Sequence, residues 1–200
     1  MAPTNIKLTY FDITGRAELA RMLFSYGRIA FEDNRVGRAE IATLKPMLPF
    51  GQVPILEVDG AVYAQSMAIN LYAAKLSGLF PSEALDALKA DMFSQGLVEL
   101  EAPFVEFMAK TPDEAKKTEL KKVFIEKTVP QRLSALDKRI GGKFILGDNI
   151  SYVDLQLLDF VAQQVALGFL DFSVDAYPAL AAVITNVKAD PKVAAYLAKQ

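Results

Sequence analysis

Residues 53–63 read VPILEVDGAVY and place two short apolar runs on either side of the pair Asp59-Gly60. This pair suits a two-residue type I′ turn, because both central residues of that turn need a positive φ. Short apolar runs bounded by such a turn are typical of β-strands. The segment therefore predicts a β-hairpin.

Strand and helix patterns alternate on both sides of this hairpin. The predicted elements are a strand at 6–11, a helix at 16–26, a strand at 31–36, a helix at 39–48, the hairpin at 53–63 and a helix over 66–76. Gly27 and Gly78 are predicted to end the first and last helices, Pro49 to end the second, and Ser66 to cap the start of the last. A βαβ unit followed by a ββα unit predicts a thioredoxin-like α/β domain.

Strand patterns disappear after Ala84, and alanine, leucine, lysine and glutamate recur at helical spacing from there on. We therefore predict a thioredoxin-like domain at 1–77, a linker at 78–84 and an all-helical domain at 85–200. Ser151 and Asp154 have the Ser-x-x-Asp spacing of a helix N-terminal cap. We interpret this pair as a folding element of the second domain.

The composition removes several classes of catalytic chemistry. The 200 residues include no cysteine, no histidine and no tryptophan. Such a chain has no Ser-His-Asp triad, no cysteine nucleophile and no disulfide. It also lacks the residues of the usual zinc sites, so no metal is expected. Proton chemistry near neutral pH falls to tyrosine, lysine and carboxylates, or to the substrate.

Charge and hydropathy narrow the range of partners. A formal net charge of −2 argues against nucleic acid, whose phosphates need a basic surface. The longest apolar stretch, 155–172, is interrupted by Gln156, Asp159 and Asp171 among others, and is too polar to cross a bilayer. No secretory signal is recognisable in the first residues. We therefore expect a cytoplasmic protein that binds neither nucleic acid nor membrane.

Four motifs stand in order along the first predicted domain. They are TYF at 9–11, GRAE at 15–18, LPFGQVP at 48–54 and QS at 65–66. With these motifs and the Ser-x-x-Asp cap of the second domain, the chain resembles the cytosolic glutathione transferases over both domains. Tyr10 points to the tyrosine type, and the segment 50–60 is most similar to the sigma class, with the pi and mu classes as neighbours.

The resemblance implies a catalytic role for Tyr10. In this family the corresponding hydroxyl donates a hydrogen bond to the sulfur of the co-substrate glutathione and stabilises the thiolate. A hydrogen bond to a charged group contributes about 1.5–3 kcal/mol, and one pKa unit is about 1.36 kcal/mol. The pKa of the thiol, about 8.5 when free, would therefore fall by about one to two units. The thiolate would attack an electrophilic, apolar second substrate, which is a detoxification chemistry.

The resemblance also implies how glutathione is held. The family carries a cis proline at the place of Pro54, which turns the backbone of Val53 toward the ligand, so that glutathione pairs with it like a short added strand. Gln65 and Ser66 stand at a predicted helix start, whose free N–H groups suit the γ-glutamyl carboxylate.

Other implied contacts involve longer polar side chains. Lys45 and Gln52 fall where the family contacts the glycyl end of glutathione. Many sigma-like relatives place an indole near position 41 for the same end, and this chain has Ile41. Arg16 is a cation at a helix start, where the helix dipole disfavours it, so a site explains it better. Glu99 takes the place of an aspartate that reaches the glutathione of the partner subunit.

The resemblance implies an apolar site for the second substrate. Its residues would be Phe11, Ile13, Phe104, Phe107 and Met108, for which plain core packing is the alternative interpretation. Phe11 is also implied as a glutathione contact.

The family implies a homodimer, in which Phe50 would be an aromatic key inserted into the partner subunit; local loop packing is the alternative for this residue. Two other functions stay open. One is a glutathione-dependent isomerase of prostaglandin type, which uses the same thiolate without consuming it. The other is a non-catalytic ligand carrier or crystallin-like structural protein, which retention of Tyr10, Gln52, Gln65 and Ser66 argues against.

Overall fold

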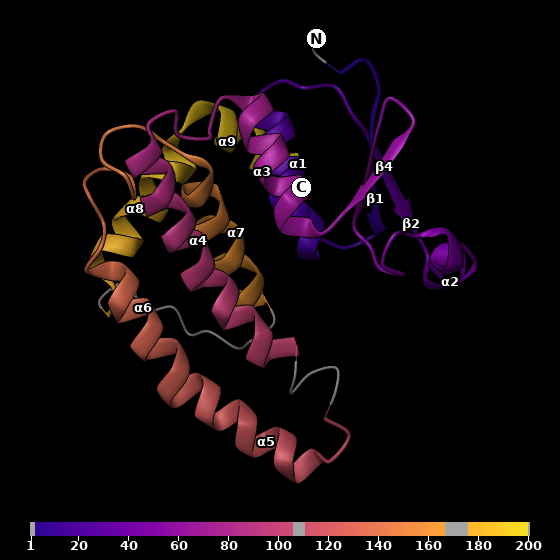
Figure 1. Cartoon of the computed structure of the whole chain (residues 1–200). Coiled ribbons are helices and arrows are strands. Elements are labelled where there is room, and N and C mark those ends of the chain that lie inside the picture. Colours follow the sequence, from indigo (N-terminus) through magenta and orange to yellow (C-terminus); the bar gives the residue numbers. More distant parts are fainter. Residues whose placement is uncertain (1–2, 106–110, 167–175, 200) are drawn as a thin grey trace. The chain divides into compact units, whose positions relative to one another are not determined.

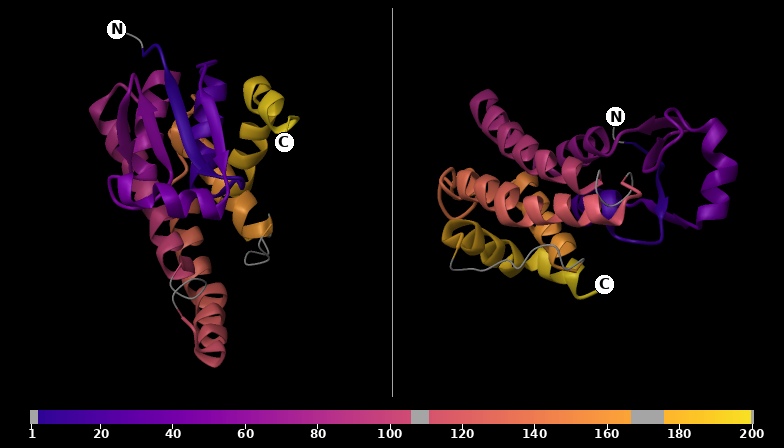
Figure 2. Two further views of the ribbon diagram at one scale, coloured as in Figure 1. Left: turned by 90° about the vertical axis from the view of Figure 1, so that its right-hand side faces the viewer. Right: turned by 90° about the horizontal axis from the view of Figure 1, so that it is seen from below.

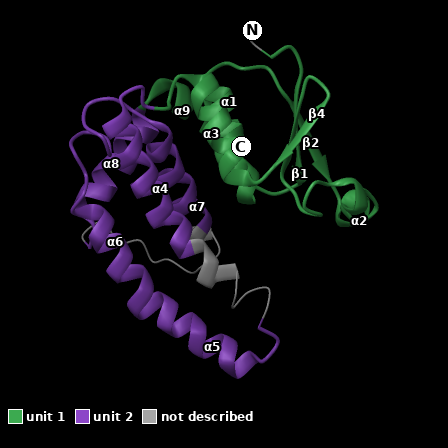
Figure 3. Cartoon of the chain, in the orientation of Figure 1, with its two compact units in different colours: residues 1–80, 190–200 green, residues 81–189 purple. Residues whose placement is uncertain are grey.

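The structure is a computed structural model of the chain, and it describes residues 3–105, 111–166 and 176–199 (Figure 1). Within these ranges, the side chains of 101–105 and 164–166 are not described. The chain divides into two compact units, one formed by Met1–Phe80 with Asp190–Gln200 and the other by Pro81–Ala189 (Figure 3). The last eleven residues, expected in the helical domain, thus pack with the first unit.

The first unit contains a four-stranded mixed sheet with helices beside it (Figures 1 and 2). Its elements are β1 (Ile6–Phe11), a 3₁₀ turn (Gly15–Ala17), α1 (Glu18–Tyr26), β2 (Glu32–Val36), α2 (Arg38–Leu44), a 3₁₀ turn (Lys45–Met47), β3 (Ile55–Val58), β4 (Ala61–Ala64), α3 (Ser66–Ser77) and α9 (Pro191–Leu197). The strand order is β2-β1-β3-β4, with β1 parallel to β2 and the other pairs antiparallel. The βαβαββα order confirms the predicted thioredoxin-like fold.

The predicted hairpin is present, with its turn at Asp59 and Gly60. Both residues have positive φ, 49° and 87°, as a type I′ turn requires. The Asp59 carboxylate accepts hydrogen bonds from the backbone N–H groups of Thr4 and Asn5 and from the Thr4 hydroxyl. The hairpin is therefore tied to the residues just before β1.

Helices α1 and α3 pack against each other on one face of the sheet (Figure 1). Gly27 ends α1, but its φ of −74° is right-handed, so it is not the left-handed cap that glycine usually provides. A Cβ at Gly27 would lie 2.7 Å from Cα of Ser77 in α3. The glycine is needed because the two helices approach closely, and not because of its own φ.

Two predicted helix limits differ from the structure. The helix predicted over 39–48 is α-helical only to Leu44 and continues as the 3₁₀ turn that contains Pro46. Ser66 is the first residue of α3 and does not cap it; Gln65 occupies the cap position, and its side chain makes no capping hydrogen bond. Gly78 ends α3 with φ 75°, as predicted.

The second unit consists of helices in the residues that the structure describes. They are α4 (Ala84–Val105), α5 (Glu114–Val123), a π-helical turn (Phe124–Thr128), α6 (Val129–Asp137), α7 (Tyr152–Ala166) and α8 (Pro178–Ala189). Leu97 and Leu100 of α4 and Leu133 of α6 are fully buried and belong to its core. The prediction of an all-helical second part is confirmed. None of the helices in the described ranges is long and apolar enough to cross a membrane.

The predicted cap of α7 is built around Asp154. Its carboxylate accepts hydrogen bonds from the backbone N–H groups of Ile145 and Ser151 and from the Ser151 hydroxyl, at 2.7–2.8 Å. Burial raises the pKa of this carboxyl, while the three hydrogen bonds act in the opposite direction. Asp154 therefore fixes both the start of α7 and the loop before it.

Candidate active site

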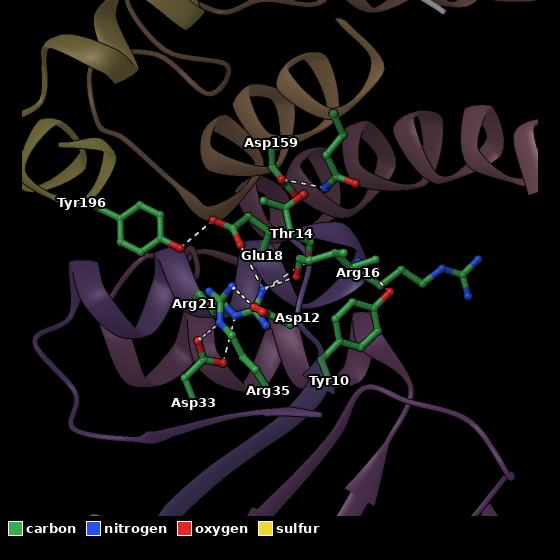
Figure 4. A network of polar contacts seen from close by, with 12 residues as sticks. Tyr10, Asp12, Thr14, Arg16, Glu18, Arg21, Asp33, Arg35, Asp159 and Tyr196 are labelled. Atoms are coloured by element: carbon green, nitrogen blue, oxygen red, sulfur yellow. Dashed lines mark hydrogen bonds and ion pairs between the residues drawn. The ribbon is translucent and has the colours of Figure 1, made fainter. Parts of the chain in front are cut away.

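Tyr10 lies near the end of β1 and is 7% exposed. Its hydroxyl oxygen accepts a 3.3 Å hydrogen bond from the backbone N–H of Arg16, at the far end of the loop that follows the strand (Figure 4). Gly15 has φ +47°, and a Cβ there would lie 2.8 Å from the Tyr10 hydroxyl. Residue 15 must therefore be glycine for the loop to fold over the hydroxyl as it does.

A shallow hollow brings together six of the residues implied to hold glutathione. It is lined by Arg16, Gln52, Val53, Pro54, Gln65 and Ser66, with Phe50 and Ala64. Its volume of about 20 Å³ leaves room for about one water molecule. A ligand at this place would lie along the surface of the unit and would not be enclosed by it.

Gln65 has an unusual backbone at the edge of this hollow. Its φ of 77° and ψ of 109° are rare for a residue other than glycine. Backbone strain of this kind concentrates at functional sites. The residue leads directly into α3, so the positive end of that helix dipole lies at the hollow. An anionic group is the chemistry that this end of the hollow suits.

The Val53-Pro54 peptide bond is cis, as the resemblance implied. Pro54 is buried and directly precedes β3, while Val53 is half-buried. Both residues line the hollow.

Two charged residues implied for glutathione, and the position where relatives carry an indole, are not among the residues that line this hollow. Lys45 is exposed in the 3₁₀ turn, and its side chain passes close to Gly51. Ile41, where relatives place an indole, is 8% exposed and belongs to the core. Glu99, in the second unit, forms an ion pair with Arg132 of α6.

The implied apolar wall is described only in part. Phe11 is half-buried and packs edge to face on Tyr10, with ring centroids 5.5 Å apart. Ile13 is 56% exposed. Phe104 lies in α4 with its side chain undescribed, and Phe107 and Met108 lie outside the described residues.

Sequence reasoning missed a network of charged groups behind the Tyr10 loop (Figure 4). Its members are Asp12, Glu18, Arg21, Asp33, Arg35 and Tyr196, which come from the loop, α1, β2 and α9. The i,i+3 spacing of Glu18 and Arg21 on a helix was the only local signal. The hydrogen bond to Asp33 raises the pKa of Arg35.

No group of three or more carboxylates placed to hold a metal ion occurs among the residues that the structure describes.

Comparison with known proteins places the chain in a family. The description "Glutathione S-transferase, N-terminal domain" matches residues 6–75, and "Glutathione S-transferase, C-terminal domain" matches residues 98–200. The two matches follow the order of the predicted α/β and helical parts.

Individual relatives cover nearly the whole chain. Hematopoietic prostaglandin D synthase of Gallus gallus is 35% identical, over 98% of this chain and 96% of that protein. S-crystallin SL11 of Nototodarus sloanii is 36% identical, over 96% and 95%. The crystal structure of the glutathione S-transferase from Ascaris lumbricoides superimposes with a TM-score of 0.83 and 30% identity, over 98% of this chain and 97% of that one. The chain therefore belongs to the glutathione S-transferase family.

Proposed function

We propose that this chain conjugates glutathione to small apolar electrophiles, with Tyr10 as the catalytic residue. The observation that carries the proposal is the double role of Arg16. Its backbone N–H donates to the Tyr10 hydroxyl, and the same residue lines the hollow formed by the implied glutathione contacts. The hydroxyl that would stabilise the thiolate therefore adjoins the surface that would hold the rest of the ligand.

The Tyr10 hydroxyl accepts from the loop and keeps its own proton for donation to the glutathione sulfur. Such a bond to a charged sulfur contributes about 1.5–3 kcal/mol and favours the thiolate. The thiol proton leaves to solvent, the sulfur forms a bond to the electrophilic carbon, and the leaving group departs with its electron pair. Holding the two reactants together supplies the rest of the rate enhancement.

The remaining contacts follow from the hollow. The γ-glutamyl carboxylate would meet Gln65, Ser66 and the start of α3, which offers N–H donors and a positive dipole end. The backbone of Val53 would pair with the ligand backbone. Gln52 would face the glycyl carboxylate from the hollow, and Lys45, which lies outside the hollow in the 3₁₀ turn, would reach the same carboxylate from there.

A glutathione-dependent isomerase of prostaglandin type is the second candidate. The 35% identity to the synthase of Gallus gallus favours it. Incubation of the protein with a prostaglandin endoperoxide tests this candidate. If no specific product forms, the isomerase function is excluded. The S-crystallin relative raises a third possibility, a structural protein, which a measurable conjugation rate would exclude.

A homodimer is part of the proposal. Phe50 is 64% exposed beside an apolar hollow of about 530 Å³ in the first unit, and Leu85, Leu88 and Met92 expose a stripe along α4 of the second. Exposed apolar surface of this kind is typical of interaction sites. We infer that a second copy covers it, and that Glu99 of each copy reaches the other's glutathione.

We further assign the chain to the sigma class, to the cytoplasm and to detoxification. The sigma class rests on the 50–60 segment and on the identity to the synthase and the crystallin.

The test is to titrate the thiol of bound glutathione in wild type and in Tyr10→Phe, together with the conjugation rate of a generic aryl halide. We expect Tyr10→Phe to raise the thiol pKa by about one to two units and to lower the rate accordingly. Tyr26→Phe removes a phenol hydroxyl from the end of α1 and is the matched control. An unchanged thiol pKa and rate in Tyr10→Phe would contradict the mechanism.

A further inference from the structure

Arg21 of α1 is a buried cation behind the Tyr10 loop, with only 1% of its surface exposed. Its Nε donates to Oδ1 of Asp33 at 3.0 Å. Its Nη1 donates to Oε2 of Glu18 at 3.1 Å and to the carbonyl oxygens of Ile13 and Thr14 at 2.9 and 3.2 Å. Figure 4 shows the guanidinium between the two carboxylates.

The two carbonyls that Arg21 holds belong to the loop between Tyr10 and Arg16. This loop brings the Arg16 N–H to 3.3 Å from the Tyr10 hydroxyl. It also places Gly15 so close to that hydroxyl that a Cβ would collide with it. A shift of the loop therefore changes the hydrogen bond that orients the hydroxyl.

The other side of the network reaches α9. The Tyr196 hydroxyl donates a 2.6 Å hydrogen bond to Oε1 of Glu18, which is 6% exposed. Glu18 thus accepts from Tyr196 with one oxygen and from Arg21 with the other. Without Tyr196, the carboxylate has to draw more on Arg21 Nη1, which is the same nitrogen that holds the loop carbonyls.

Asp33 is the other anion beside Arg21, and its carboxylate also pairs with Arg35. Its Oδ2 pairs with Arg35 at 2.8 Å, and Arg35 pairs with Asp12 in the same loop at 3.1 Å. The loop is therefore held at Asp12 as well as at the two carbonyls.

Stability alone does not account for this arrangement. A buried ion pair is often no more stabilising than apolar residues of similar size. Moreover, Nη2 of Arg21 is buried with no hydrogen-bond partner among the described residues, which adds a desolvation cost. The buried guanidinium does, however, fix the backbone of the loop beside Tyr10, because it holds the carbonyl groups of Ile13 and Thr14.

We propose that Arg21 is a positioning residue for the thiolate-stabilising hydroxyl, and that α9 takes part through Tyr196 and Glu18. This inference rests on the proposed function of Tyr10. The C-terminal helix thereby influences the ionisation of bound glutathione without touching it.

The test compares Tyr196→Phe with Tyr26→Phe in the full chain. Both variants remove one hydroxyl from a tyrosine that joins α1 and α9. The Lys192 ammonium of α9 lies 4.3 Å from the centroid of the Tyr26 ring, but only Tyr196 belongs to the network. The measurements are the thiol pKa of bound glutathione, and kcat and KM for an aryl halide across pH.

We expect Tyr196→Phe to raise the thiol pKa and to lower the rate about three- to tenfold where the thiol is mostly protonated, a tenfold loss corresponding to one pKa unit. The rate should recover at high pH, and KM for glutathione should change little. Tyr26→Phe should leave the pH profile as in wild type. A merely structural loss would scale the rate equally at every pH.

Arg21→Lys keeps the charge but loses the fork that reaches several acceptors, so it should shift the profile further in the same direction. If Arg21→Lys does not fold, the pH profile of Tyr196→Phe is sufficient to test the positioning role. A pH profile of Tyr196→Phe identical to wild type overturns the positioning role, while a shift in Tyr10→Phe still supports the proposed function. An unshifted profile in Tyr10→Phe overturns both.

Discussion

Tyr196 and Glu18 are 178 positions apart in the sequence, and the hydroxyl of the first donates a 2.6 Å hydrogen bond to Oε1 of the second. The bond joins α9 to the first helix of the same compact unit. Because Glu18 also accepts from Arg21, the end of the chain is connected to the loop that orients Tyr10.

Gly15→Ala should damage catalysis more than stability. The new Cβ would lie 2.8 Å from the Tyr10 hydroxyl, and φ +47° costs an alanine about 1–2 kcal/mol. We expect the conjugation rate to fall by about tenfold or more, because the loop must move away from the hydroxyl. Gly37→Ala is the control, since no heavy atom beyond the adjacent residues lies within 4 Å of a Cβ there. Equal rates in the two variants would contradict the loop's role.

Asp154→Asn should lower the free energy of unfolding by about 2–3 kcal/mol, because one oxygen of a fully buried carboxylate becomes an amide nitrogen, which cannot accept the hydrogen bonds from the Ser151 N–H and hydroxyl. Ser151→Ala removes only the hydroxyl donor and should cost about 1 kcal/mol. Urea unfolding of both variants gives the comparison. A loss in Asp154→Asn no greater than in Ser151→Ala would show that the backbone donors contribute little.

Phe50→Ser should weaken the proposed homodimer. An aromatic ring that is 64% exposed in the single chain would be a central contact if a second copy covers it. We expect the dissociation constant, measured by sedimentation equilibrium, to rise about tenfold or more. Val123→Ser, at another exposed apolar residue, is the control. A wild-type mass near 21.9 kDa in dilute solution would rule the dimer out.

Asp59 should make stability depend on pH in the acid range. The hydroxyl of Thr4, followed by the N–H of Asn5, lowers the pKa of Asp59. A carboxyl with a lowered folded pKa stabilises the fold above its unfolded value of about 3.9, and this contribution is lost as the pH falls through the folded pKa. Asp59→Asn tolerates the positive φ and should therefore be less stable than wild type at neutral pH. The difference should shrink on acidification, whereas a constant difference would mean that the charge plays no part.

Local signals predicted much of the first unit. The Asp59-Gly60 turn is confirmed because turn chemistry depends on the two residues themselves. The roles predicted for Gly27 and Ser66 were corrected because they depend on tertiary structure. Gly27 is needed where α3 approaches α1 closely, and Gln65, with its strained backbone, occupies the cap position that was predicted for Ser66. A helical sequence pattern contains neither piece of information.

In the candidate site, too, some residues could be predicted from the sequence and others could not. The motifs name Arg16, Gln52 and Gln65, and the fold brings them to one hollow. The helix pattern of 16–26 does not reveal that Arg21 points to the backbone of the preceding loop. Its carbonyl partners carry no side-chain identity, so no sequence motif marks them.

By itself the sequence determined the family, the order of strands and helices, and the absence of cysteine and histidine that leaves the reactive thiol to the substrate. These follow from residue types and short spacings. Only the tertiary structure decided that Asp190–Gln200 packs with the first unit, and that Tyr196, Glu18 and Arg21 form one chain of hydrogen bonds to the Tyr10 loop. The physical reason is that a buried charge is matched by whichever partners the fold brings within about 3 Å, and their distance along the sequence has no bearing on that match.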